Sequence, residues 1–120
     1  MQYALLAYSP TSPTSPTEEA DRAERPIAGA LADLLDQPSV TGWARLHAEG
    51  SATTLRQSDG RTLLTDGPFI DSKEYLAGVI LIEAENLDRA LAIAEELLQQ
   101  TRPGTAIEVR PMLGGRFRGA

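Results

Sequence analysis

The chain has 120 residues, of which eleven are basic and seventeen acidic, giving a net charge of −6. Because phosphate contacts need clustered lysine and arginine, this balance argues against direct nucleic-acid binding. Hydrophobic residues make up 42% of the chain, enough for the buried core of one domain. The absence of cysteine excludes disulfides and thiolate chemistry, and one histidine cannot form a histidine-only metal site.

No apolar run approaches the ~18 residues that a membrane span needs, and no charged leader precedes the opening run. We therefore expect a cytoplasmic protein that has no contact with a membrane. The sequence contains no nucleotide-binding glycine motif and no common hydrolase motif, so we predict neither a cofactor nor a metal.

The N-terminal part predicts a strand, a loop and a helix. Residues 3–8 are apolar on both alternating faces, which is typical of a central strand covered on both sides. A Ser-Pro-Thr repeat fills residues 9–17; its prolines favour an inserted loop, or alternatively a partner-binding segment. Thr17 can cap a helix that Pro26 kinks or restarts. The apolar stripe of that helix consists of Ile27, Leu31, Leu34 and Leu35.

The middle of the chain predicts four strands. Residues 42–49 alternate between apolar and polar side chains, as a half-buried strand does. Residues 52–57 and 61–65 flank Asp59-Gly60, which favours a hairpin because glycine tolerates positive φ. Residues 76–83 end in an apolar run that predicts a buried strand.

The last part predicts a helix capped by Asn86, a strand over residues 107–110 and a frayed tail over residues 114–120. The apolar stripe of the helix consists of Leu87, Ala90, Leu91, Ala94, Leu97 and Leu98. The order of elements predicts an α+β fold of the ferredoxin-like, split βαβ type with an inserted β-hairpin. Because both helices would cover one face of the sheet, we expect the other face to pack on a second copy in a homodimer.

Four motifs resemble a known family. They are MQYALLAY at the start, Thr53-Thr54-Leu55-Arg56, Thr65-Asp66-Gly67-Pro68-Phe69 with Ser72-Lys73-Glu74, and Ile107-Glu108-Val109-Arg110-Pro111. In this order and spacing they are similar to the DGPF, or YCII-related, family of small bacterial proteins. The resemblance covers residues 1–8 and 40–113, and it implies a single domain over residues 1–113 that forms a dimeric α/β barrel.

The resemblance also implies association of some members with sigma factors of the extracytoplasmic-function type. Relatives of the same broad group carry a histidine shortly after an Arg-Pro pair on the first helix, proposed as half of a His–Asp catalytic pair. Here Arg25-Pro26-Ile27-Ala28 places an alanine in that region, so the resemblance supplies no such pair.

The candidate ligand-binding residues surround the loop at residues 66–69. Asp66 can hydrogen-bond the backbone, Gly67 permits an unusual φ and Pro68 stiffens the turn, a combination that suits either dimer packing or the wall of a pocket. The full set is Trp43, Arg56, Asp66, Gly67, Pro68, Phe69, Lys73, Glu74 and Arg110.

Two arginines end apolar strand segments. If Arg56 and Arg110 converge, their guanidinium groups would suit a carboxylate or phosphate ligand. The alternative is that they pair with Glu74 and Glu108, because acidic residues are in excess.

Lys73 and His47 are the catalytic candidates. Lys73 is the only lysine; if buried it could act as a base or form a Schiff base, and otherwise it would form a salt bridge with Asp66 or Asp71. His47 could act as a general base if Glu49, its neighbour on the same face of the predicted strand, orients it. The alternative is a solvated histidine.

Two functions stay open. The first is a homodimer that binds a small anionic metabolite, with or without proton-transfer catalysis. The second is an interaction module for a regulatory, sigma-factor-type protein. An acidic first helix would offer that basic partner a surface formed by Glu18, Glu19, Asp21, Glu24, Asp33 and Asp36.

Overall fold

The computed structural model describes residues 1–10, 26–70 and 72–117. The predicted cap at Thr17, most of the Ser-Pro-Thr repeat and most of the acidic surface lie outside these residues. The described elements are β1 (Gln2–Pro10), α2 (Gly29–Leu35), β2 (Val40–Arg45), a 3₁₀ turn (Glu49–Ser51), β3 (Thr53–Ser58), β4 (Arg61–Asp66), β5 (Glu74–Glu83), α3 (Leu87–Gln99) and β6 (Ala106–Pro111). No helix in this part of the chain is long and apolar enough to cross a bilayer.

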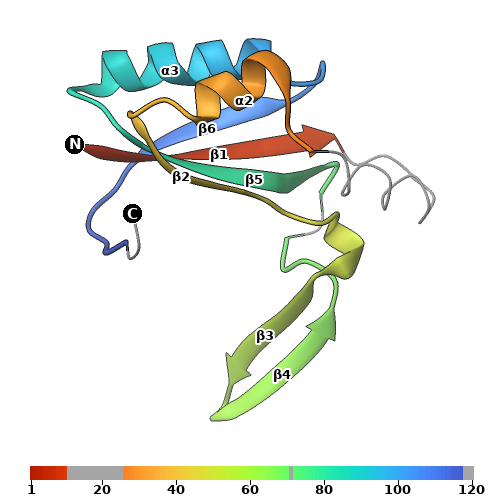
Figure 1. Ribbon diagram of the computed structural model, residues 1–120. Helices are drawn as coiled ribbons and strands as arrows, with labels where there is room; N and C mark the ends of the chain where they lie inside the picture. Colours follow the sequence, from red (N-terminus) through yellow and green to blue (C-terminus); the bar gives the residue numbers. More distant parts are fainter. Residues whose placement is uncertain (11–25, 71, 118–120) are drawn as a thin grey trace.

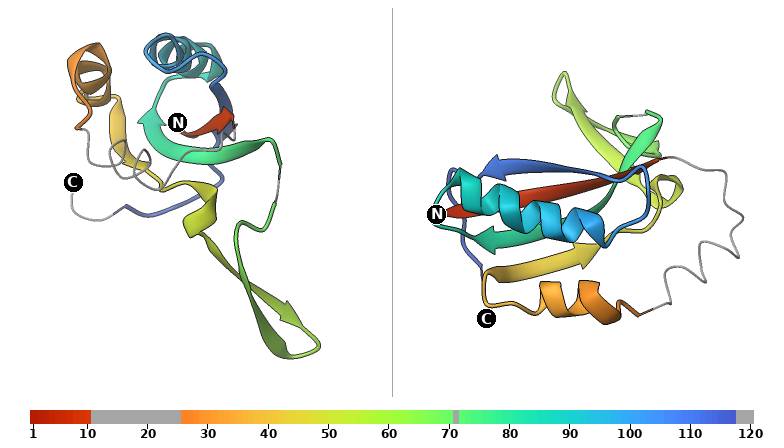
Figure 2. Two further views of the ribbon diagram at one scale, coloured as in Figure 1. Left: turned by 90° about the vertical axis from the view of Figure 1, so that its right-hand side faces the viewer. Right: turned by 90° about the horizontal axis from the view of Figure 1, so that it is seen from above.

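The fold is α+β, as predicted, with two antiparallel sheets. Four strands form the larger sheet in the order β2-β5-β1-β6, and β3 pairs with β4 in a separate hairpin. Helices α2 and α3 lie on one face of the larger sheet, and the hairpin projects away from its other face (Figures 1 and 2). The hairpin therefore stands apart from the layered body of the domain.

The core lies between the larger sheet and the helices. Tyr3 and Leu5 of β1, Ile82 of β5 and Leu97 of α3 are its largest fully buried side chains. Tyr3 and Ile82 are opposite each other in the register of β1 and β5, so both point towards the helices. Alternation along the first half of β1 thus places Tyr3 and Leu5 in the core. The sequence predicts a strand covered on both sides, whereas in the described residues the helices cover only one of its faces.

Helix α3 begins where the sequence predicts, but its buried face is shifted. The side chain of Asn86 accepts a hydrogen bond from the backbone N–H of Arg89 at 2.9 Å, as expected of a helix cap. The predicted stripe is only partly correct: Leu87, Leu91 and Leu98 are exposed, whereas Ile93, which it omitted, is buried. A helix resting on a sheet from one side buries only the stripe facing that sheet.

The predicted strand over residues 42–49 is too long. Strand β2 ends at Arg45, opposite Gly78 of β5. The backbone N–H of Leu46 still donates to the carbonyl oxygen of Ala77, and the chain then leaves the sheet. Alternating polarity in the sequence continues past this point, although Leu46 and His47 are both exposed and Ala48 and Glu49 both half-buried, so the pattern alone cannot locate the end of the strand.

The hairpin is confirmed where the sequence predicts it. Ser58 pairs with Arg61, and the two turn residues Asp59 and Gly60 have φ values of 51° and 76°. Two consecutive positive φ angles are what a tight hairpin turn requires, and Asp-Gly is a favoured pair for adopting them.

The face of the larger sheet away from the helices is also apolar. Leu6 of β1 is opposite Val79 of β5, and their chain neighbours Leu5 and Ile80 point to the core, so Leu6 and Val79 point the other way. Ala4 and Leu81 extend this second face. No helix in the described part of the chain covers it, and we refer to it as the open face.

We predict that Leu97→Ala lowers the free energy of unfolding by about 2–5 kcal/mol, because it removes a side chain that is 1% exposed from the packed core. The matched control is Leu91→Ala on the same helix, where the side chain is 46% exposed. It should change stability by about 0.5 kcal/mol or less. Urea unfolding of both variants measures the difference, and equal losses would contradict this description of the core.

Candidate functional site

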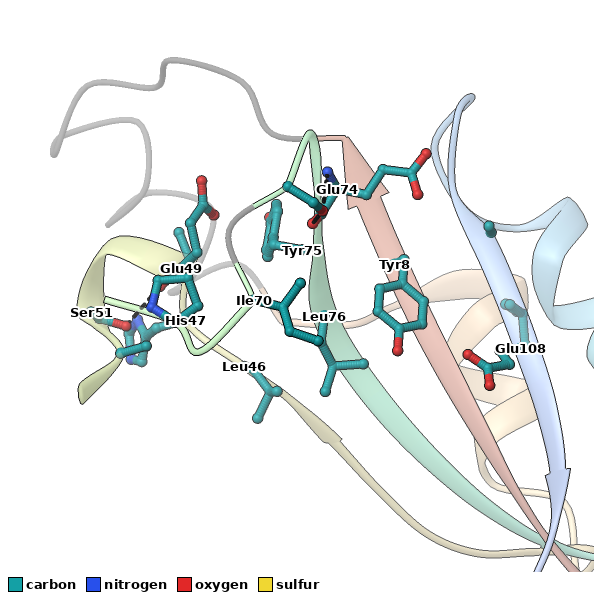
Figure 3. A pocket seen from close by; sticks show the side chains of 16 residues that line it. Tyr8, Leu46, His47, Glu49, Ser51, Ile70, Glu74, Tyr75, Leu76 and Glu108 are labelled. Carbon is teal, nitrogen blue, oxygen red and sulfur yellow. Dashed lines mark hydrogen bonds between the residues drawn. The ribbon is translucent and has the colours of Figure 1, made fainter. Parts of the chain in front are cut away.

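A cavity of about 880 Å³ lies where the hairpin joins the larger sheet (Figure 3). Its volume is in the range of pockets that hold small molecules. Three parts of the chain form its walls: the ends of β1, β5 and β6, the segment between β2 and β3, and the segment between β4 and β5. The lining side chains on which we base the chemistry below are Tyr8, Leu46, His47, Glu49, Ile70, Glu74, Leu76 and Glu108.

The cavity has an apolar middle and polar sides. Leu46, Ile70 and Leu76 lie between two groups of polar side chains (Figure 3). Tyr8 and Glu108 come from the sheet. The pair His47 and Glu49 comes from the opposite wall. An imidazole, carboxylates and a phenol thus border a largely apolar space.

A short 3₁₀ turn fixes the wall that carries His47 and Glu49. The N–H of Ser51 donates to the carbonyl oxygen of Ala48 at 3.0 Å, and the hydroxyl of Ser51 donates to the same oxygen at 2.8 Å. The N–H of Ala52 donates to the carbonyl oxygen of Glu49 at 3.1 Å. These local bonds compensate for the loss of sheet pairing where the chain leaves β2.

The loop at residues 66–69 ties the base of the hairpin together. The N–H of Gly67 donates to the carbonyl oxygen of Ala52 at 2.7 Å, and the hydroxyl of Thr54 donates to the carbonyl oxygen of Gly67 at 2.7 Å. The guanidinium of Arg56 lies 5.3 Å from the ring centroid of Phe69, within the range of a cation–π contact. The loop therefore sets how the hairpin leaves the domain, and Pro68 contributes to the wall of the cavity.

The structure brings only some of the predicted site residues together. His47, Pro68 and Glu74 line the cavity. The remaining predicted residues are not among its lining residues: Trp43, Arg56, Asp66, Gly67, Phe69, Lys73 and Arg110. Ligand binding by these residues stays a prediction.

The two arginines do not converge within one chain. Arg56 lies on the hairpin and stacks on Phe69, whereas Arg110 lies on β6 and forms an ion pair with Glu108. The hydrogen bond from Arg110 and the negative charge of Glu108 raise the pKa of this guanidinium above its ordinary value. The alternative interpretation, pairing with Glu108, is thus confirmed for Arg110.

The two catalytic candidates differ in position. Lys73 does not line the cavity, and among the described residues no ion pair joins it to Asp66; its other predicted partner, Asp71, lies outside the described residues. His47 and Glu49 are both on the cavity wall, although β2 ends before them. In the parts of the chain that the structure describes, no cluster of three histidine or acidic residues is arranged for a metal.

Sequence reasoning missed Tyr8, Leu76 and Ile70 as cavity residues. Tyr8 is opposite Leu76 of β5 on one side and Ala106 of β6 on the other, so these three residues form one row across the end of the sheet. An aromatic residue at the end of a central strand was the available signal. The pairing of β1 with β5 shifts between Ala7 and Tyr8, where β5 has one extra residue, Ala77. This bulge changes the alternation of β5, and the sequence does not reveal it.

Comparison with known proteins gives a family and one relative. The sequence model of the family described as "YCII-related domain" matches residues 1–113. An uncharacterised protein of Rhizobium meliloti (strain 1021) is 44% identical over 69 residues, an alignment that covers 58% of this chain and 56% of the relative. The match thus spans little more than half of either protein.

We predict that Gly67→Ala loosens the base of the hairpin. Gly67 has a φ of 99°, and a left-handed conformation costs a residue with a side chain about 1–2 kcal/mol. The amides of β3 and β4 should therefore exchange hydrogen faster. The control is Gly50→Ala in the neighbouring 3₁₀ turn, where an added methyl group meets nothing within 4 Å and φ is ordinary. If both variants exchange like the unmodified protein, the loop does not hold the hairpin.

Proposed function

This chain belongs to the YCII-related family, and on that premise we propose that it is a homodimeric protein that binds a small molecule in the cavity at the base of the hairpin. The observation that carries the proposal is the combination of an apolar cavity, bordered by His47 and carboxylates, with an apolar open face beside it. The first feature suits a ligand and the second suits a second copy of the chain.

We propose a ferredoxin-like subunit whose open face meets that of a second copy in a dimeric barrel. Support comes from the strand order β2-β5-β1-β6, with β3 and β4 inserted as a hairpin and both helices on one face. Leu6, Val79 and Leu81 of the open face are the kind of side chains that two stacked sheets bury between them. A twofold axis would pair this face with itself.

The charges of the cavity favour a ligand with an apolar body and a positively charged or hydrogen-bond-donating group. Three carboxylates line it, those of Glu49, Glu74 and Glu108. Of these three, only Glu108 forms an ion pair within the described residues, and its partner is Arg110. His47 is the basic side chain on the wall. Attraction to the carboxylates of Glu49 and Glu74 supports an amine rather than an acid.

An anionic ligand is the second candidate, and it rests on the sequence. It would need Arg56, Lys73 and Arg110 to act together, and a single chain separates Arg56 from Arg110. This ligand class therefore requires cations from two copies of the chain. The sequence also allows a regulatory protein partner in place of either ligand.

The same cavity supports proton transfer. Histidine is the side chain that most readily gains and loses a proton near neutral pH, and Glu49 lies on the same wall of the cavity. The hydroxyl of Tyr8 faces the cavity from the sheet and offers a second proton donor. If the protein is an enzyme, His47 acts as the base and Tyr8 as a hydrogen-bond donor to the substrate.

We predict that benzylamine binds in the cavity more tightly than benzoate, an acid of similar size and opposite charge. Backbone amide shifts in a titration followed by NMR locate the site and give both dissociation constants. Glu49→Gln should weaken benzylamine binding by about fivefold, equivalent to about 1 kcal/mol for an exposed charge pair. Glu85→Gln, on an exposed residue outside the cavity, should not. Tighter binding of benzoate would favour the anionic ligand, and no shifts in the cavity would refute the site.

We also predict that Val79→Glu weakens the dimer, because it places a carboxylate in the middle of the stacked open faces. The matched control, Ala30→Glu, adds the same charge to an exposed position of α2 on the helix side. The melting temperature of a dimer rises with protein concentration. This dependence should persist in the control and be lost in Val79→Glu; its persistence in both would contradict a dimer through the open face.

A further inference from the structure

Two apolar segments project from the domain on the side of the open face. One is the hairpin, where Leu55 and Leu64 are 65% and 67% exposed. The other is the tail formed by residues 112–117, in which Leu113 is fully exposed and Phe117 half exposed. Figure 1 shows both below the larger sheet, the hairpin at one end of the strands and the tail at the other.

The described part of the chain gives the hairpin little support from other helices and strands. An isolated two-stranded hairpin is marginally stable in water and needs a further surface to pack against. Leu55 is directly opposite Leu64, so both side chains point from the same face of the hairpin. The other face carries Arg56, which stacks on Phe69, and Leu63 opposite it. The Leu55–Leu64 face is therefore the one left for a partner.

The tail is anchored at its start and apolar beyond it. The N–H of Met112 donates to the carbonyl oxygen of Gln2 at 2.8 Å, which holds the start of the tail beside β1. Leu113, which is fully exposed, and Phe117, which is half exposed, follow it. A segment fixed at one end that presents large apolar side chains is a suitable surface for the leucines of the hairpin.

The hairpin is long enough to reach past the sheet of a stacked second copy. Strand β3 has six residues, Thr53–Ser58, and so extends about 20 Å, whereas stacked sheets lie about 10 Å apart. A hairpin that leaves the open face must therefore run beside the second copy and past its sheet. A twofold axis perpendicular to the strands places the hairpin end of one copy beside the tail end of the other.

We propose that the Leu55–Leu64 face of each hairpin packs against residues 112–117 of a second copy. The inference rests on the homodimer proposed above and adds two hairpin–tail contacts to its interface. One twofold rotation forms both contacts, because the hairpin of each copy then lies against the tail of the other copy. An axis parallel to the strands would pair hairpin with hairpin and leave both tails exposed.

Engineered cysteines test this arrangement cleanly, since the chain has none of its own. A variant carrying both Leu64→Cys and Leu113→Cys, treated with a short bismaleimide, should run on a denaturing gel at twice the 12.9 kDa of the chain. Each single variant should stay at the mass of one chain. The control pair Leu91→Cys and Leu113→Cys, with one thiol on the outer side of α3, should give no covalent dimer.

The outcomes separate this inference from the proposed function. Crosslinking of Leu64→Cys alone would mean that the hairpins meet each other, and the inference would be wrong while the dimer stands. No crosslink in a protein that sediments as a dimer would also overturn the inference. A protein that sediments as a monomer would refute the proposed homodimer itself. A monomer whose hairpin amides become protected on adding another protein would assign the hairpin to that partner.

A second pair of variants tests the energetic role of the hairpin. Leu55→Ser with Leu64→Ser should raise the dimer dissociation constant at least tenfold. The control replaces Gln57 and Thr62 by serine, because these two residues are the next opposed pair on the same hairpin face. Its dissociation constant should stay within twofold of the unmodified protein. Unchanged hydrogen exchange in the larger sheet would show that both variants fold, and equal dissociation constants would overturn the inference.

Discussion

The structure depends on one constraint: an antiparallel sheet with apolar side chains on both faces has both of the described helices on the same side. Tyr3, Leu5 and Ile82 are buried under those helices, while Leu6 and Val79 point away from them. In the proposed dimer, a second copy buries the second set of side chains. The hairpin and the tail project on this same side, so the surfaces that the proposed dimer uses lie together (Figure 1).

The candidate site lies where the layered body and the hairpin meet. Its walls come from the sheet, from the 3₁₀ turn after β2 and from the loop around Gly67, whose hydrogen bonds to Ala52 and Thr54 join the two strands of the hairpin base. The same loop thus shapes the cavity and directs the hairpin. In the proposed dimer, ligand binding and association would share this loop, so a ligand in the cavity would act on the dimer as well.

Local signals in the sequence were sufficient to predict where individual elements turn or begin. Asp59-Gly60 located the hairpin turn and Asn86 the start of α3, because each acts through bonds to its immediate neighbours. The end of β2 and the buried stripe of α3 depend on which segments pack together, and alternation or helical period does not show this. The cavity was harder still: it joins three distant segments, and the arginines and lysine that suggested an anion site do not line it.

The central claim is that the open face is covered by a second copy, and the molecular mass of the unmodified protein in solution tests it most directly. Sedimentation equilibrium at micromolar concentration, in buffer of physiological ionic strength, should give twice the 12.9 kDa of the chain. A mass of one chain at every concentration would contradict the claim, because the apolar open face, hairpin and tail would then remain in water without a partner.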